Sequence, residues 1–389
     1  MKMNIEGYID PKFEPIRQTY KDNFDNGLDI GSSLAITCEG NTVVDIWGGH
    51  RDIAQTLPWE EHTIVNVFSS TKNMTSLCAF LLADKGELDF FAPVSRYWPE
   101  FAANNKSEIL ISHVMSHSSG LSGWQEPITT QDLNDWEKCC ELLSKQEPWW
   151  KPGEAIAYHA LTVGYLMGEV VRRISGQSLG TFFKENIADP LQADFHIGLD
   201  ESHFNRVAEI HMPDNPNPTD MLELKPGSIA EKTFVNGMIQ PSDALTEEWR
   251  KAEIPAGNGH GNARSMAKCM ALMANGGISH GKNLLSDEIV KMALNEQIRG
   301  EDLALGPSVV WGLGFSLQDD SSDIWHGYFG NRNVVFWSGW GGSLSIADMD
   351  SRTSFCYTPY KMEEDILGGP RSNSLVKGYV DLITQLNKA

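Results

Sequence analysis

Several features that often decide the class of a protein are missing from this 389-residue sequence. No apolar run approaches the roughly 18 residues of a membrane-spanning helix. The first 20 residues contain no apolar stretch of seven or more, so the sequence predicts no secretory signal. We therefore expect a protein with no membrane span and a cytoplasmic location.

Cysteine is scarce, and its spacing does not suit a metal. The six cysteines are scattered, no C-x-x-C occurs, and no Cys/His spacing is typical of zinc. In a chain without a signal, we expect them to be reduced and buried thiols. His113 and His117 lie four residues apart, as two metal ligands on a helix would, but no Glu directly follows His113, so no metal site is predicted.

Positive charge is also in deficit. The chain has 52 acidic and 31 basic residues, a formal net charge of −21, and no dense Lys/Arg cluster. Nucleic acid and anionic membranes would repel such a protein, so neither is expected as a partner. The hydrophobic fraction of 41% and the charged fraction of 21% are ordinary for a soluble globular protein with a large core.

The pattern of apolar and polar residues changes along the chain. Residues 32–49 alternate around Glu39-Gly40-Asn41 and predict a β-hairpin. Four further β-rich runs are followed by a predicted terminal helix over 372–386, whereas apolar spacing predicts helices between these ends. The β-rich runs are 309–318, 333–342, 343–350 and 353–360, and the helices 70–84, 161–174 and 265–277.

This order predicts an α/β (α+β) fold. Residues 1–67 and 298–389 would form the α/β part, with strands from both chain ends in one sheet. Residues 68–297 would form a mostly helical part inserted between them. We expect a single catalytic domain, with its groove at the junction of the two parts.

Two short motifs could hold a nucleophilic serine. Gly176-Gln177-Ser178-Leu179-Gly180 matches G-x-S-x-G, a motif that needs a strand before the serine and a helix after it. Here a helix precedes the motif and Gly176 resembles its cap, so we interpret Ser178 as the cap of the next helix.

The second motif is Ser69-Ser70-Thr71-Lys72, an S-x-x-K at a helix start. Ser69 and Lys72 would share one face, with their Cβ atoms about 5–6 Å apart. The helix N-terminus provides free N–H groups and a positive field, and burial would lower the pKa of the lysine. A neutral lysine is a competent base for a serine hydroxyl. By itself the motif is weak, because a capping serine with an exposed lysine is far commoner.

Four later segments follow this motif in order: SHVMSHSSGLSG (112–123), the stretch from Lys151 to Ser178, EIPAGNGHGNARSMAKCMALMANGG (253–277) and FWSGWGGSLSIAD (336–348). With VFSSTK they resemble the serine β-lactamase and penicillin-binding-protein superfamily. The likeness is closest to the class C β-lactamases and the family VIII carboxylesterases. It implies a β-lactamase/transpeptidase-like fold, an antiparallel sheet flanked by helices with a mostly helical subdomain.

The resemblance implies roles for individual residues. Ser69 corresponds to the nucleophile and Lys72 to its general base. Tyr158, which follows the turn Pro152-Gly153, corresponds to the tyrosine of the second motif, a phenol that would hydrogen-bond to Lys72 and relay the proton. The alternative for Tyr158 is a core aromatic.

The third motif of the superfamily, usually Lys- or His-x-Gly, reads Trp337-Ser338-Gly339 here. That departure resembles the family VIII esterases. The N–H groups of Ser69 and Trp340 would form the oxyanion hole. We expect Trp337, Ser338, Gly339 and His159 to contact the substrate, although packing is the alternative role for the tryptophans.

A second departure concerns β-lactam recognition. Class C β-lactamases carry Asn two residues after the tyrosine, whereas this sequence has Ala160. Two polar anchors for a β-lactam are therefore missing, and the sequence predicts a serine carboxylesterase for short-chain esters that needs no metal or organic cofactor. The alternatives are a β-lactamase or D-amino-acid peptidase, an acyltransferase, and a non-catalytic binding protein. Oligomeric state is not predicted.

Overall fold

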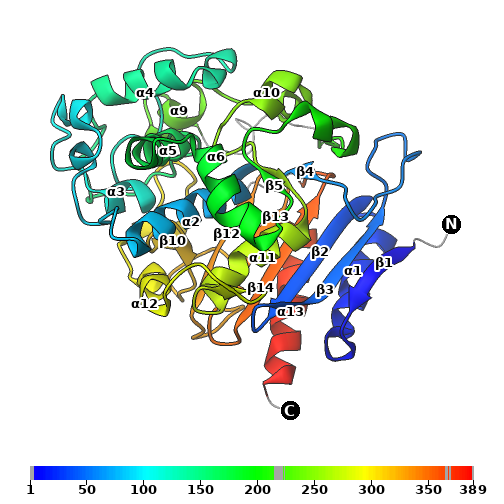
Figure 1. The fold of residues 1–389 in the computed structure, drawn as a ribbon. Coiled ribbons are helices and arrows are strands. Elements are labelled where there is room, and N and C mark those ends of the chain that lie inside the picture. Colours follow the sequence, from blue (N-terminus) through cyan, green and yellow to red (C-terminus); the bar gives the residue numbers. More distant parts are fainter. Residues whose placement is uncertain (1–3, 214–221, 223, 364–366, 368, 388–389) are drawn as a thin grey trace.

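The computed structural model describes residues 4–213, 222, 224–363, 367 and 369–387. Within these residues, nine strands form one antiparallel sheet (Figure 1). Their order is β1 (Ile5–Ile9), β3 (Asn41–Gly49), β2 (Gly31–Cys38), β14 (Thr353–Pro359), β13 (Ser343–Asp348), β12 (Val334–Gly339), β11 (Ser316–Leu317), β10 (Ser308–Trp311) and β9 (Ile298–Glu301).

Strands from both chain ends therefore pair in one sheet, as the sequence predicted. The contact is made by β2 and β14, in a register that sets Leu34 opposite Tyr357. The predicted hairpin joins β2 to β3 through Glu39 and Gly40, whose φ angles are 49° and 76°. Two residues with positive φ make the tight turn whose twist matches that of the strands.

The period-2 alternation of these strands divides the core in two. Leu34, Ile36 and Phe355 belong to the cluster that includes the terminal helix α13 (Pro370–Leu386), whereas Ala35 and Cys356 belong to the cluster on the other face. Helix α1 (Pro15–Asp25) contacts α13, and α11 (Ala263–Ala274) packs on β2, β13 and β14.

The packing of α11 differs from the predicted layout. Its residues lie in the stretch 68–297 assigned to the helical part, yet Met266, Ala267 and Met270 pack against the sheet. The apolar face of an isolated helical segment does not say which element covers it. By its contacts this helix belongs with the α/β part.

The remaining helices form a layer beyond α2 (Thr71–Asp84), and Figure 1 shows this layer on the side opposite α1 and α13. Helix α2 packs on α5 and α6 and also contacts β12, and it buries nearly all of its side chains rather than the single face predicted. The other helices are α3 (Ile111–Met115), α4 (Trp136–Lys145), α5 (Thr162–Ser175), α6 (Leu179–Phe183), α7 (Asp189–Leu191), α9 (Ile229–Phe234), α10 (Glu247–Lys251) and α12 (Asp287–Lys291).

Two small sheets complete the described part. The first joins β4 (Val65–Asn66), β6 (His260–Gly261) and β5 (Phe195–His196), and the second pairs β7 (Ile278–Ser279) with β8 (Lys282–Asn283). Strand β4 leads directly into the 3₁₀ turn η2 (Phe68–Ser70) and then into α2. The first small sheet therefore anchors the S-x-x-K segment.

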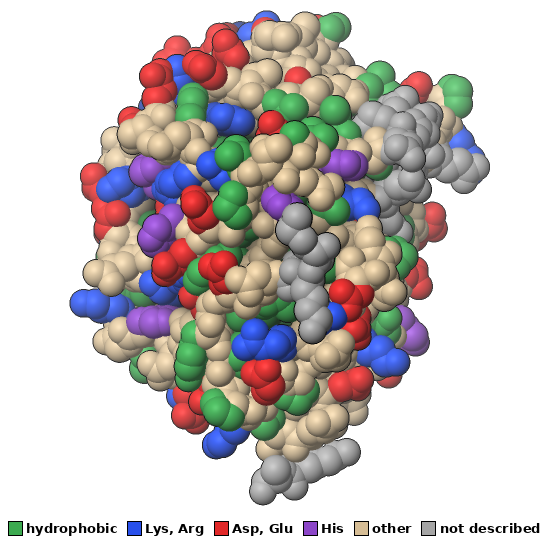
Figure 2. Space-filling view, turned by 90° about the vertical axis from the view of Figure 1, so that its right-hand side faces the viewer, with side chains coloured by type: hydrophobic (Ala, Val, Ile, Leu, Met, Phe, Trp, Pro, Cys, Tyr) green, Lys and Arg blue, Asp and Glu red, His purple; other side chains and the backbone are tan. Residues whose placement is uncertain are grey.

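Among the described residues, no helix is both long and apolar enough to cross a bilayer. On the face drawn in Figure 2, acidic and basic side chains are interspersed rather than gathered by sign. The six cysteines are all unpaired thiols, and five of them are buried, as expected from their scattered spacing.

Candidate active site

Ser69 lies in a short turn that is held in an unusual backbone conformation. Phe68, directly before it, has a φ of +44°, a region that non-glycine residues rarely adopt. The turn is fastened by Ser343, whose hydroxyl donates to the Val67 carbonyl at 2.7 Å and bonds to Ser70 Oγ at 2.8 Å. Such strain persists only where the surroundings hold it. The result is a partly exposed Ser69 between two buried neighbours.

Lys72 lies one turn further along and points at Ser69. Its Nζ is 3.1 Å from Ser69 Oγ, 2.7 Å from the Ala160 carbonyl and 2.8 Å from the Ala256 carbonyl. The side chain is 5% exposed, and burial holds its pKa well below the usual range. Among the described residues, no carboxylate pairs with it.

This arrangement suits a neutral amine. Burial without a counter-charge favours the uncharged form of a lysine. A neutral amine has two N–H groups, which the two carbonyls accept, and one lone pair, which is left for the hydroxyl of Ser69. The geometry therefore allows Lys72 to take the proton of Ser69.

Tyr158 faces the same pair from the opposite side. Its hydroxyl accepts a hydrogen bond from Trp337 Nε1 at 2.8 Å and interacts with Ser69. Burial raises the pKa of the phenol, so the hydroxyl stays protonated at neutral pH. The predicted hydrogen bond between Tyr158 and Lys72 is absent from the described contacts. Lys72 Nζ lies instead over the ring face, 4.7 Å from its centroid.

Asp302 supports Tyr158 from behind, and sequence reasoning missed it. The fully buried carboxylate accepts from the backbone N–H groups of Tyr158 at 3.0 Å, Ala304 at 2.9 Å and Leu305 at 3.0 Å. An Asp that accepts from its own following residues is a common turn signal. Nothing in the sequence, however, connects it with a tyrosine 144 positions earlier.

His159 does not occupy the predicted substrate-contacting position. The ring is fully buried, with Nε2 at 2.6 Å from Ser119 Oγ and Nδ1 at 2.7 Å from the Ala157 carbonyl. Burial lowers its pKa to about 4, so it is neutral. Its backbone N–H donates to His117 Nδ1 at 3.0 Å. His159 thus fixes the loop that carries Tyr158, because both ring nitrogens already have protein partners.

Trp337 has the packing role that the sequence left open as its alternative. Only 3% of it is exposed, its ring lies 5.0 Å from that of Tyr158, and its indole N–H orients the Tyr158 hydroxyl. Ser338 and Gly339 complete the end of β12, and their contact with a substrate stays a prediction. Among the described residues, no group of His, Cys, Asp and Glu could hold a metal ion.

Strand β12 reaches the turn that carries Ser69 through Gly339. A Cβ on Gly339 would lie 2.1 Å from the Val67 carbonyl, so only glycine allows this approach. Trp340 follows directly, and its ring packs on Phe68 at 5.5 Å. Within the described chain, no protein group accepts from the backbone N–H of Ser69 or Trp340. Both donors are therefore free for a ligand, as an oxyanion hole requires.

A largely apolar pocket opens beside Ser69. It contains about 710 Å³ of empty space including its mouth, within the range of small-molecule sites. Its polar side chains already have partners: Ser122 Oγ bonds to Thr233 Oγ1 at 2.6 Å, and the Asn236 amide bonds to backbone groups. The lining comprises Phe68, Ser69, Ser122, Trp124, Tyr158, Ala160, Leu161, Thr233, Phe234, Asn236, Gly237, Met238, Ile239, Ala256, Gly257 and Trp340.

The competing serine lies in a helix cap, as predicted. Helix α5 ends at Ser175, and Gly176 adopts a left-handed φ of 74°. Ser178 accepts from the Thr181 N–H at 3.2 Å and donates to Glu253 Oε1 at 2.6 Å. Ser178 is thus the N-cap of α6, and a helix precedes the motif where a nucleophile elbow needs a strand.

Comparisons with known proteins place these features in a family. The sequence model of the beta-lactamase family matches residues 21–364. "Esterase/beta-lactamase LipL" of Mycobacterium tuberculosis is 36% identical over 295 residues, covering 74% of this chain and 68% of that protein. The crystal structure of a family VIII carboxylesterase is similar at a TM-score of 0.90 and 34% identity, covering 97% of this chain and all of that one. A penicillin-binding protein homologue from Caulobacter crescentus gives 0.89 and 33%, again over 97% and 100%.

Proposed function

We propose that this chain, which belongs to the beta-lactamase family, is a serine esterase that hydrolyses short, uncharged carboxylic esters through an acyl-enzyme. One observation carries the proposal. Lys72 Nζ has two carbonyl acceptors and, 3.1 Å away, the Ser69 hydroxyl, with no carboxylate among the described residues to hold it charged. A serine at the mouth of an apolar pocket with a neutral amine beside it is a nucleophile with its base.

In the acylation step, Ser69 Oγ bonds to the ester carbonyl carbon while its proton passes to Lys72 Nζ. The carbonyl oxygen becomes an oxyanion, which the N–H groups of Ser69 and Trp340 would stabilise. When the tetrahedral intermediate collapses, the carbon–alkoxy bond breaks. The leaving alkoxide takes a proton from the Tyr158 hydroxyl. The proton on Lys72 then restores the phenol through solvent, because among the described contacts no hydrogen bond joins Lys72 to the Tyr158 hydroxyl.

Deacylation repeats these steps with water in place of Ser69. Water gives its proton to the Lys72 amine and bonds to the acyl carbon, and a second oxyanion forms. The bond to Ser69 Oγ then breaks, Oγ takes a proton from the Tyr158 hydroxyl, and the proton that Lys72 took from water restores the phenol. Tyr158 is suited to donate, because burial raises its pKa and the indole N–H of Trp337 occupies one of its lone pairs.

The pocket supports an uncharged acyl group. Among the described residues, no Lys, Arg or His lines this pocket, and the Asn236 amide is already bonded to backbone groups. A charged acyl group of the substrate would find no partner in the pocket, and burying an unpaired charge is costly. Six unpaired cysteines also fit the proposed location in the cytoplasm.

β-Lactam hydrolysis is a second candidate. It is favoured by the esterase/β-lactamase relative from Mycobacterium tuberculosis, which is 36% identical to this chain. Against it stand Ala160, which offers no amide, and Trp337 in place of the cation of the third motif. Transfer of the acyl group to an alcohol would use the same Ser69 chemistry. Hydrolysis and acyl transfer differ only in whether water or an alcohol accepts the acyl group.

A parallel assay tests the proposal. Turnover of p-nitrophenyl acetate, butyrate and octanoate is measured beside a chromogenic cephalosporin and with added butanol. We expect turnover of acetate and butyrate, loss of it by about 10⁴-fold or more in Ser69→Ala, and retention in Ser178→Ala, because Ser178 only caps a helix. Loss confined to Ser178→Ala would reject the assignment. Cephalosporin turnover without ester turnover would favour the second candidate, and butyl ester formed faster than free acid would indicate a transferase.

A further inference from the structure

The turn that carries Trp340 is intrinsically loose. It continues through Gly341 and Gly342, whose φ angles are +88° and +102°. Two successive glycines have more backbone freedom than any other pair of residues. The direction of the Trp340 N–H therefore depends on what holds this turn from outside.

The N-terminal side of the turn is held at the nucleophile. Gly339 lies against the Val67 carbonyl, and its own carbonyl accepts from the Gly342 N–H at 2.9 Å. Ser343, just after the turn, donates to the same Val67 carbonyl. These contacts fasten Gly339 and Ser343, but they leave Gly341 to other partners.

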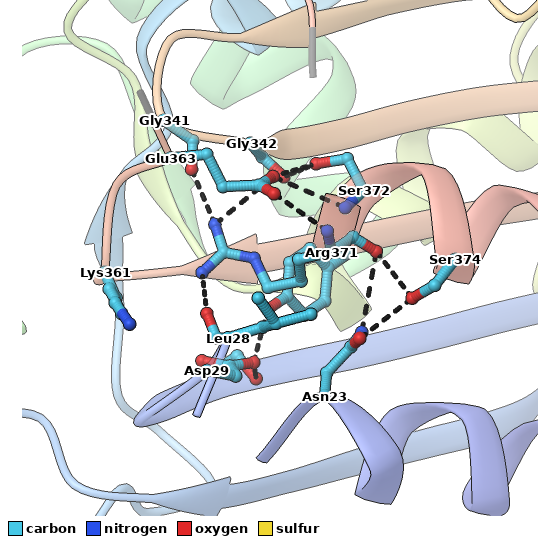
Figure 3. Close-up of polar contacts among 12 residues, drawn as sticks. Asn23, Leu28, Asp29, Gly341, Gly342, Lys361, Glu363, Arg371, Ser372 and Ser374 are labelled. Carbon is cyan, nitrogen blue, oxygen red and sulfur yellow. Dashed lines mark hydrogen bonds and ion pairs between the residues drawn. The ribbon is translucent and has the colours of Figure 1, made fainter. Parts of the chain in front are cut away.

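Arg371, at the start of α13, holds the other side (Figure 3). Its guanidinium is fully buried, and Nη2 donates to the Gly341 carbonyl at 2.7 Å. Nη1 donates to the Leu28 carbonyl at 3.1 Å, and the group lies 5.6 Å from the centre of the Tyr357 ring. A guanidinium cannot lose its charge in a protein, so its burial at this point requires partners of fixed geometry.

Glu363 completes the clamp. Its backbone N–H donates to the Gly341 carbonyl at 3.2 Å, which thus accepts two hydrogen bonds. Its carboxylate accepts from the Arg371 N–H at 2.8 Å and from Ser372 Oγ at 2.6 Å, and it lies 3.8 Å from Arg371 Nη2. A Cβ on Gly342 would lie 2.7 Å from this carboxylate, so clamp and turn are in direct contact.

We propose that Arg371, with Glu363 as its partner, is a positioning residue that aims the Trp340 N–H at the oxyanion by holding the Gly341 carbonyl. The inference rests on the proposed esterase function. Arg371 touches no substrate: it acts through the turn. Its loss should weaken stabilisation of the tetrahedral intermediate while leaving binding of the neutral ester nearly unchanged.

The test compares Arg371→Met and Arg371→Lys with Ser374→Ala. Ser374 Oγ lies 2.9 Å from the Arg371 carbonyl and 2.8 Å from Asn23 Oδ1, so it supports the same helix turn through contacts that do not include residues 341 or 342. Three quantities are measured: kcat and KM for p-nitrophenyl butyrate, Ki for phenylboronic acid, which forms a tetrahedral adduct with the serine, and the thermal midpoint.

We expect Arg371→Met to lower kcat by about 10- to 100-fold, less than the loss of a whole oxyanion donor, with KM changed by less than about threefold. The boronate Ki should rise in step with the fall in kcat. Arg371→Lys keeps one donor and should recover part of both, whereas Ser374→Ala should shift the thermal midpoint but neither kcat nor Ki. If Arg371→Met does not fold, Arg371→Lys carries the comparison.

Three results would overturn the inference: unchanged kcat in a folded Arg371 variant, an unchanged boronate Ki despite lower kcat, or equal effects in Ser374→Ala. Failure of the esterase proposal itself would be seen separately, as full turnover in Ser69→Ala. The two outcomes use different variants and cannot be confused.

Discussion

Lys72 and Lys106 are two buried lysines with nearly the same surroundings. Lys106 donates to the carbonyls of Ala103 at 2.8 Å and Gln146 at 2.5 Å, and it lies 5.4 Å from the centre of the Phe101 ring. Lys72 likewise has two carbonyl acceptors and an aromatic ring beneath it. Burial lowers the pKa of both, that of Lys106 to about 8.

The two lysines differ in what each amine contacts besides its two carbonyl acceptors. Lys72 faces the hydroxyl of Ser69, a residue that lines the pocket, whereas among the described residues no hydroxyl bonds to Lys106 Nζ. Glu147 also raises the pKa of Lys106, and no carboxylate does so for Lys72. Burial alone therefore gives a lysine only a structural role. The adjacent hydroxyl and pocket are what allow Lys72 to act as a base.

The strongest way to break this comparison is to remove each amine in turn. Lys72→Met should lower kcat/KM for p-nitrophenyl butyrate by about 10²–10⁴-fold, the usual contribution of a general base, whereas Lys106→Met should keep it within about twofold. Each variant leaves two buried carbonyls without a donor, so both should lose stability, by about 1–3 kcal/mol for each carbonyl. Denaturant titration measures that loss. Equal loss of activity in both folded variants would contradict the assignment.

Replacement of Tyr158 by phenylalanine gives Lys72 the same kind of ring that Lys106 has. Tyr158→Phe should keep the amine over an aromatic face but remove the hydroxyl that donates to the leaving alcohol, and kcat should fall by about 10²-fold. The fall should be larger for an alkyl ester than for the p-nitrophenyl ester, whose leaving group needs no proton. Paired measurements with ethyl and p-nitrophenyl butyrate check this, and an equal fall for both would argue against proton donation by Tyr158.

The smallest effect, pH dependence, sharpens the comparison further. Only neutral Lys72 can accept the proton of Ser69, and burial lowers its pKa. Activity should therefore be full above the folded-state pKa of Lys72 and fall as pH drops through it, by about tenfold per unit. The acid limb of the kcat/KM profile should be unchanged in Lys106→Met. If the acid limb moved in this variant, the titrating group would be Lys106 and the assignment to Lys72 would be wrong.

The stability of the fold should depend on pH in the opposite sense to that given by a salt-bridged lysine. A lysine with a lowered folded-state pKa binds more protons when unfolded, so its burial destabilises the fold increasingly as pH falls from about 10.5 toward the folded pKa. For Lys106 this window runs from about 8 upward.

Local signals explain which parts of the fold could be predicted. The Glu39-Gly40 turn, the apolar spacing after Ser69 and the helix before Gly176 are each encoded within a dozen residues, and the structure confirms the hairpin, α2 and the Ser178 cap. The placement of α11 on the sheet and the burial of α2 on nearly all sides depend on neighbours far away in the chain. No local pattern encodes them.

The sequence by itself determined the order of the elements, the serine and lysine one helical turn apart, and the resemblance that pointed to Tyr158. Only the tertiary structure decided that Trp337 and Asp302 orient Tyr158, that His159 supports its loop, and that Arg371 clamps the turn after Trp340. Helical spacing acts over three or four residues and is written in the chain. The other contacts join positions from 30 to 179 residues apart, and only packing brings those positions together.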